Sequence, residues 1–484
     1  MRFLRPVLVA ATLALALFSR DTRAQILFGT AARAENAIER FEFAAAHREL
    51  DNANLDDPEL RFFAGKLAVY ESECDRAIEL LSSLGDSSEV RSVLAIAKGC
   101  ARVMASSITE TDEAAGVWIR FQDEHDRPLK GMIVETVLRA REVLTHDLEA
   151  TWPRPTRVLV VRDQLSLAAV TGLPYESAQK TGTVAVAKWA RVAMLSPRAN
   201  VHGFVWRDTL AHELTHLAIS RSTADQAPLW LQEGIAKTEE TRWREKGPFD
   251  DRPSSDDIAR DGIRKKMDLP LDHLGPSLAM LPNADIARVA YAEVTSFVQF
   301  LEREKPGILP KLLAALSDGK GFPEALAEIT GRPFAELDKK WRAELAAGKS
   351  AATTAPTPPK ADGREKARLA ELLIARGHGQ AALTELEKVQ FPKDEPWIRS
   401  LHGEALHLVG KDVEAAERVG EPDGLRGPYA PWWSIRARVL PTGPLRDGAF
   451  VEALSNDPYD GPAACEGGGD PALCAAAKQF PVLP

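Results

Sequence analysis

The residues of this chain best suited to chemistry are His212, Glu213 and His216, which form the pattern HExxH. On a helix, positions i and i+4 lie on one face a turn apart, so both imidazoles can reach a single ion. Glu213 then lies beside the ion without binding it. Residues 209–220 contain no proline or glycine, and Asp208 is a candidate N-cap, so the segment predicts a helix. The spacing indicates a Zn²⁺ site with an adjacent base.

A catalytic zinc ion takes three protein ligands and keeps one position open. One known extension of the pattern would place glycine at position 219 and histidine at position 222, but this chain has Ile219 and Ser222. The third ligand must therefore be an acid further along the chain.

Glu233 is the preferred third ligand, 17 residues after His216. Pro228 suits the first turn of a second helix, and two antiparallel helices joined by the loop of residues 220–227 would bring Glu233 to the ion. Three rival acids follow the motif. Asp225 falls in a polar loop, and we expect Glu239 and Glu240 on an exposed face. His202 and His273 are expected to be surface or supporting histidines, because a fourth protein ligand would close the site.

The elements around the motif predict an α+β fold. Strand-like apolar runs occupy residues 117–121, 156–162 and 183–195, with helical patterns between them and a long helical stretch after them. We therefore expect a mostly helical catalytic domain with a small sheet over residues 111–347.

Helical regions flank this domain. Residues 25–110 read as paired helices that weakly resemble tetratricopeptide (TPR) hairpins, and a plain helical bundle is the alternative. Residues 348–363, rich in alanine, threonine and proline, predict a linker. Residues 364–484 show a helix, turn and helix pattern repeated at roughly 34 residues, which resembles TPR repeats.

The N-terminus has the layout of a secretory signal peptide over residues 1–24: two arginines, a short apolar run and small residues around Ala24. An uncleaved membrane anchor is the alternative. These expectations place the protein in the periplasm or outside the cell. The formal net charge is −9, and without residues 1–24, which carry four arginines and one aspartate, it is −12. This acidity argues against nucleic acid or anionic membrane as the main partner.

The chain has four cysteines, two in each flanking region. In an oxidising compartment Cys74 would pair with Cys100, and Cys465 with Cys474. Four unpaired, partly buried thiols are the alternative.

The segments HELTH and WLQEG, followed by residues 290–345, resemble the peptidase MA-like families of the gluzincin clan, the thermolysin-type zinc peptidases. The resemblance covers roughly residues 115–347. It implies a zincin-like fold, zinc on His212, His216 and Glu233, and Glu213 as the general base for a zinc-activated water. Tyr291 resembles a tyrosine that stabilises the oxyanion in such enzymes. The alternative is that Tyr291 is a core residue with a packing role only. Such relatives often have an aromatic residue where this chain has Lys237-Thr238.

The sequence thus predicts an extracytoplasmic zinc-dependent peptidase, with peptide or protein substrates and with helical repeats available to protein partners. A repeat-based envelope assembly or chaperone-like scaffold with a vestigial zinc domain is the alternative, and a non-peptidic amide hydrolase is a second one. The presence of Glu213 favours an enzyme, because a scaffold needs no base beside the ion.

Overall fold

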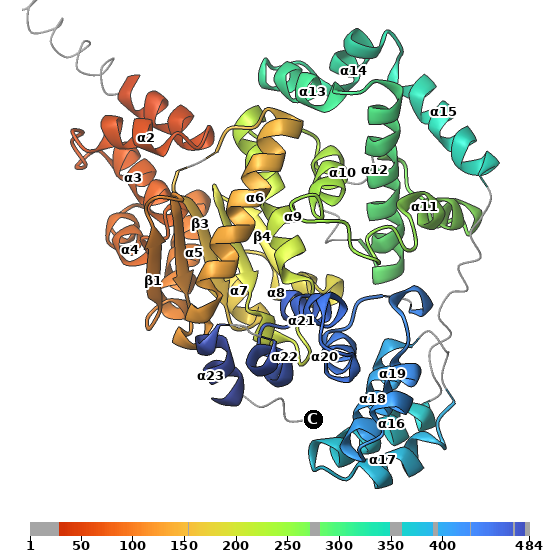
Figure 1. Cartoon of the computed structure of the whole chain (residues 1–484). Coiled ribbons are helices and arrows are strands. Elements are labelled where there is room, and N and C mark those ends of the chain that lie inside the picture. The colour runs from red at the N-terminus through yellow and green to blue at the C-terminus, as the bar shows by residue number, and fades with distance from the viewer. Residues whose placement is uncertain are drawn as a thin grey trace, which may run out of the picture. The chain divides into compact units, whose positions relative to one another are not determined.

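The computed structural model describes residues 29–152, 154–271, 281–348, 361–390, 395–425, 427–467 and 470–479 (Figure 1). The predicted signal peptide, His273 and most of the predicted linker lie outside these residues. Among the described residues, none of the helices combines the length and the apolar character needed to cross a bilayer. The chain divides into two compact units.

The first unit comprises the described residues up to Ala105 together with Trp189–Arg191. It is helical: a helix over residues 29–39 is followed by α2 (Phe43–Leu50), α3 (Pro58–Tyr70), α4 (Cys74–Ser82) and α5 (Ser88–Val103). Asp57 caps α3 by accepting hydrogen bonds from the backbone of Glu59 and Leu60. A disulfide joins Cys74 on α4 to Cys100 on α5, the pair expected from the sequence.

The second unit comprises Ser106–Lys188 and the described residues from Val192 onward. Its five-stranded sheet has the order β1-β2-β3-β5-β4. The strands are β1 (Ile108–Asp112), β2 (Val117–Phe121), β3 (Thr156–Val161), β4 (Ala185–Lys188) and β5 (Arg191–Leu195). β1 pairs with β2 antiparallel, and β2 pairs with β3 parallel. The sheet is therefore mixed, and β4 is one of its edges.

The strand prediction for residues 183–195 was wrong in one respect. Two strands, β4 and β5, replace the single run, because Trp189 and Ala190 both adopt positive φ angles, 56° and 55°, and reverse the chain. β1 was not predicted, since its sequence ITETD is polar and its residues are at most half-buried at the other sheet edge. The remaining strands agree with the apolar runs.

Helices make up most of this unit. In its first half they are α6 (Lys130–Leu148), α7 (Gln164–Thr171), α8 (Tyr175–Thr181), α9 (Trp206–Thr223), α10 (Leu229–Glu239), α11 (Ser255–Arg264), α12 (Ala284–Glu304), α13 (Ile308–Ser317), α14 (Phe322–Thr330) and α15 (Phe334–Ala347). Short 3-10 turns span Glu124–Leu129 and Pro197–Ala199. α6 and α9 pack on each other, and their buried side chains share one core with β2, β3 and β5. The predicted fold class, α+β and mostly helical with a small sheet, is confirmed.

The C-terminal part continues as helix pairs. They are α16 (Ala361–Ala375) with α17 (Gly379–Leu386), α18 (Pro396–Leu408) with α19 (Asp412–Val419), and α20 (Ala430–Val439) with α21 (Pro444–Asn456). α22 (Gly461–Glu466) and α23 (Pro471–Gln479) follow, joined by the disulfide Cys465–Cys474. Tyr459 and Leu473 belong to the same hydrophobic core as the sheet. Of the last helices, α21 contacts α9, the HExxH helix, and α23 contacts the 3-10 turn Glu124–Leu129.

Candidate metal centre

Helix α9 carries both histidines of the motif, and its local sequence explains why it is helical and buried. Leu210, Leu214 and Leu217 recur every three or four residues, and all three are buried. The cap predicted at Asp208 is wrong: Val205 is the N-cap, and no side chain caps the helix. Asp208 lies within the first turn instead and accepts hydrogen bonds from Arg244 and from the indole of Trp243.

Helix α10 carries Glu233 and runs back beside α9, because the chain reverses between them. Ala224 and Asp225 adopt left-handed φ angles of 48° and 59°, and Pro228 precedes the first turn of α10. The exposed Asp225 is part of this turn, so it is not a ligand candidate. Antiparallel packing of α9 against α10 is the arrangement that the sequence predicted.

Aromatic packing fixes α10 against the helices behind it. Trp230 contacts Phe297 of α12 with ring centroids 5.9 Å apart, and Phe297 contacts Trp341 of α15 at 5.4 Å. Gly234 allows close approach, since a Cβ atom there would lie 2.6 Å from the carbonyl oxygen of Val294 on α12. Glu233 is thus carried by a helix held on several sides.

The structure brings His212, His216 and Glu233 together. The Nε2 atoms of the two imidazoles are 3.2 Å apart, and Oε2 of Glu233 lies 3.3 Å from Nε2 of His212 and 3.4 Å from that of His216. All three side chains are about nine-tenths buried. In the described part of the chain, no other group of three potential ligands converges in this way.

The donor set fits a divalent cation. Oε2 of Glu233 is buried and has no hydrogen-bond donor among the described residues. Burial opposes ionisation of this carboxyl, but the two imidazoles outweigh that effect and hold its pKa well below the usual range. Burial also lowers the pKa of His212, whereas Glu233 and Glu240 raise it by more, to about 10. Two nitrogen ligands and one carboxylate oxygen are a set that zinc prefers.

Glu213 lies beside this group and outside it. Its buried carboxylate accepts a hydrogen bond from the backbone N–H of Ala187 on β4, at 2.5 Å. Burial raises the pKa of Glu213 above its ordinary value. A carboxylate with a raised pKa, fixed next to a cation site, has the properties of a general base.

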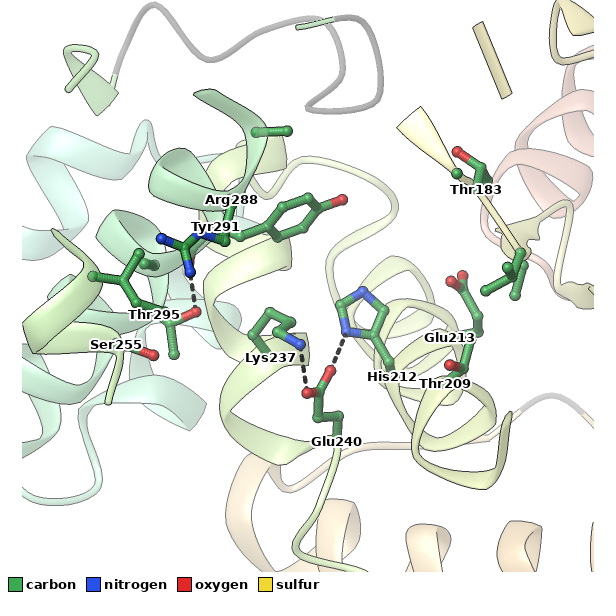
Figure 2. Close-up of a pocket in the computed structure, with 16 residues that line it drawn as sticks. Thr183, Thr209, His212, Glu213, Lys237, Glu240, Ser255, Arg288, Tyr291 and Thr295 are labelled. Carbon is green, nitrogen blue, oxygen red and sulfur yellow. Dashed lines mark hydrogen bonds and ion pairs between the residues drawn. The ribbon is translucent and has the colours of Figure 1, made fainter. Parts of the chain in front are cut away.

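The expectation that Glu239 and Glu240 lie on an exposed face was wrong. Oε2 of Glu240 lies 3.3 Å from Nδ1 of His212, the ring nitrogen that faces away from Glu233, and its Oε1 pairs with Lys237 at 2.5 Å (Figure 2). Glu239 is buried, and Arg242 pairs both with it and with Asp147. Glu240 therefore contacts His212 on the side of the ring opposite Glu233, whereas Glu239 pairs with Arg242.

Sequence reasoning missed this contact, although a signal was present. Glu240 follows Glu233 by seven residues, two helical turns, and so falls on the same face of α10. Lys237 occupies the intervening turn. The same spacing that favours Glu233 thus also indicates Glu240.

A pocket of about 500 Å³ opens beside His212 and Glu213. One wall is the chain from Gly182 to Ala185, which leads into edge strand β4, and the facing wall is made by α11 and α12. Tyr291 lies on this facing wall and points its ring into the pocket (Figure 2). Burial, followed by the charges of Glu233 and Glu213, raises the pKa of Tyr291 well above its ordinary value, so its hydroxyl keeps its proton.

His202 is not part of this group. Its Nε2 lies 3.4 Å from a carboxylate oxygen of Glu371, and its ring contacts Tyr429 edge-on at 5.3 Å. His202 thus supports packing, as the sequence suggested.

In a comparison with known protein families, the model of the Peptidase MA superfamily matches residues 155–347. No curated protein matches the chain. The match begins at β3 and ends at the last residue of α15, so it includes α9, α10 and α12 with all the residues of the candidate centre. The domain formed by residues 155–347 is therefore peptidase MA-like, which indicates a hydrolase of the peptidase type.

Proposed function

We propose that this protein is an extracytoplasmic zinc-dependent peptidase of the gluzincin type. The observation that carries the proposal is the convergence of His212, His216 and Glu233. Their potential ligand atoms lie 3.2–3.4 Å apart, and Glu213 lies beside them on the wall of an open pocket. The peptidase MA-like domain supports the reaction class.

His212, His216 and Glu233 would hold the zinc ion, and Glu240 would orient His212 through Nδ1. When bound, zinc polarises a substrate carbonyl and makes water more acidic. Glu213 accepts the proton of the attacking water at its carboxylate and later returns it to the leaving amine. Burial raises the pKa of Glu213, which makes its carboxylate a stronger base than that of an exposed glutamate.

The Tyr291 hydroxyl and the edge of strand β4 would both contact the substrate. The Tyr291 hydroxyl, which stays protonated, donates a hydrogen bond to the oxygen on which negative charge develops. Strand β4 is a sheet edge beside the pocket. Apart from the Ala187 N–H, which donates to Glu213, its edge can pair with an extended peptide as a further strand. Peptides are therefore the substrate class that this wall favours.

An extracytoplasmic location is also a proposal. It rests on the signal-peptide layout of residues 1–24 and is supported by the two disulfides, Cys74–Cys100 and Cys465–Cys474, which suit an oxidising compartment. We also propose that the flanking helix pairs, whose sequence resembles TPR repeats, provide surfaces for protein partners.

The test compares wild type with Glu213→Gln and Tyr291→Phe in metal analysis and in cleavage of a broad peptide library. We expect one zinc per chain in all three proteins. Hydrolysis should fall by about 10²–10⁴-fold in Glu213→Gln, because the base is lost, and should fall in kcat for Tyr291→Phe. Glu245→Gln, an exposed glutamate beyond α10, is the matched control and should behave as wild type. Zinc retention without cleavage of any peptide by wild type would favour a scaffold with a vestigial zinc domain.

A further inference from the structure

The C-terminal helices are fixed on the catalytic region at a defined place. The backbone N–H of Phe204, just before α9, donates to the carbonyl oxygen of Asn456 at the end of α21, at 3.0 Å. Gly203 allows this approach: its φ is +63°, and a Cβ atom there would lie 2.1 Å from the same oxygen. The Tyr459 hydroxyl donates to the carbonyl oxygen of His125, at 2.9 Å. α21 is therefore tied to the start of the HExxH helix.

A second cavity, of about 340 Å³, lies between α21 and the segment from α9 to Asp250. Its volume is typical of sites for small ligands. Thr209, Lys237 and Glu240 line both this cavity and the pocket beside the metal centre, so the two spaces are neighbours. Glu452 and Ser455 of α21 close the far side.

The cavity combines apolar walls with one carboxylate that lacks a cation. Trp243, Phe249 and Pro428 supply apolar surface. Arg244 is shared by Asp208 at 2.6 Å and Asp250 at 2.8 Å, and Lys237 is taken by Glu240 at 2.5 Å.

Glu452 differs from these charged residues of the cavity because its carboxylate forms no ion pair among the described residues. Arg244, Asp208 and Asp250 are its electrostatic neighbours. Burial raises its pKa. A cation entering the cavity would offset the cost of ionising the buried Glu452 carboxyl. An anion would find that the cations lining the cavity, Arg207, Lys237 and Arg244, are each paired with a carboxylate already.

We propose that this cavity is a specificity subsite for a lysine or arginine side chain of the peptide substrate, close to the bond that is cleaved. The aliphatic stem would lie along Phe249 and Pro428, and the cationic head would pair with Glu452. Since Glu452 and Pro428 lie beyond residue 347, the C-terminal helices complete a site that the peptidase MA-like domain begins. This proposal rests on the proposed peptidase function.

The test uses the full-length zinc-loaded protein. Cleavage of a peptide library, read by mass spectrometry, should show a preference for lysine or arginine at one position near the cleaved bond. For a matched peptide pair with lysine or glutamine at that position, Glu452→Gln should lower kcat/KM about tenfold for the lysine peptide, the loss expected for one charge-assisted contact, and leave the glutamine peptide unchanged. Glu452→Lys should favour acidic residues there. Asp447→Asn, an exposed acid on the same helix, is the control and should change neither rate.

Equal losses for both peptides in Glu452→Gln, or a wild type without preference for basic residues, would overturn this subsite while leaving the peptidase function intact. If wild type cleaves nothing, the peptidase function fails, and equilibrium binding of the two peptides decides about the cavity. Binding of the lysine peptide that weakens about tenfold in Glu452→Gln would support a basic-peptide site. Equal binding of both peptides would refute it.

Discussion

Replacement of Glu240 by glutamine tests how the chain supports its first metal ligand. The Glu240 carboxylate joins two groups: Oε2 lies 3.3 Å from Nδ1 of His212, and Oε1 lies 2.5 Å from Nζ of Lys237. Burial raises the pKa of Glu240, but Lys237 and His212 lower it by more, so the group is ionised at neutral pH. Glutamine has the same shape and keeps an oxygen atom near Nδ1, so the substitution removes mainly the charge.

The expected effect is a zinc affinity 10–100-fold weaker, which corresponds to about 1.4–2.7 kcal/mol. The loss has two sources. A carboxylate behind a ligating imidazole increases the basicity of the ring, and glutamine does so less. In addition, Lys237 loses its counter-charge and then repels a divalent cation nearby. Lys237→Met combined with Glu240→Gln should therefore recover part of the affinity that Glu240→Gln loses.

The assay is competition for zinc with a chromophoric chelator, with thermal unfolding of the metal-free proteins as a check on folding. Glu245→Gln, an exposed acid on the same segment, should bind zinc as wild type does. An unchanged affinity in Glu240→Gln would refute the supporting role of Glu240. A double variant as weak as Glu240→Gln alone would refute the contribution of Lys237.

Two further predictions concern the packing behind the site. Gly234→Ala should destabilise the fold by about 1–3 kcal/mol in urea unfolding, because the added methyl group meets the Val294 carbonyl oxygen; stability equal to wild type would show that α10 and α12 can move apart. Burial raises the pKa of Glu293 to about 7 from its usual 4.5, so the folded state holds a proton that the unfolded state releases, and stability falls as pH rises through this window. In Glu293→Gln, up to about 3 kcal/mol of the unfolding free energy that wild type loses between pH 4.5 and 7 should no longer be lost. Urea unfolding at several pH values measures this difference. Parallel pH profiles of variant and wild type would contradict the prediction.

Local sequence was sufficient for the elements whose residues carry their own pattern. The spacing of His212 and His216 determines that they share a helix face, and the apolar runs at 117–121 and 156–162 became β2 and β3. Pro228 marked the start of the helix that carries Glu233. These features depend on the spacing of residue types and on backbone restrictions within a few residues. Both can be read directly from a single sequence.

The tertiary structure decided what depends on contacts between distant segments. Asp225, Glu233, Glu239 and Glu240 all follow the motif closely, and only the antiparallel packing of α9 on α10 brings Glu233 to both imidazoles, while Glu240 reaches the back of His212. Likewise, Tyr291, some 80 positions after His212, lines the pocket beside the metal centre. Glu452, some 240 positions after His212, lines the neighbouring cavity. Sequence spacing says how far apart residues lie along a helix or strand, but which faces of separate elements meet is fixed by the shared core that buries them.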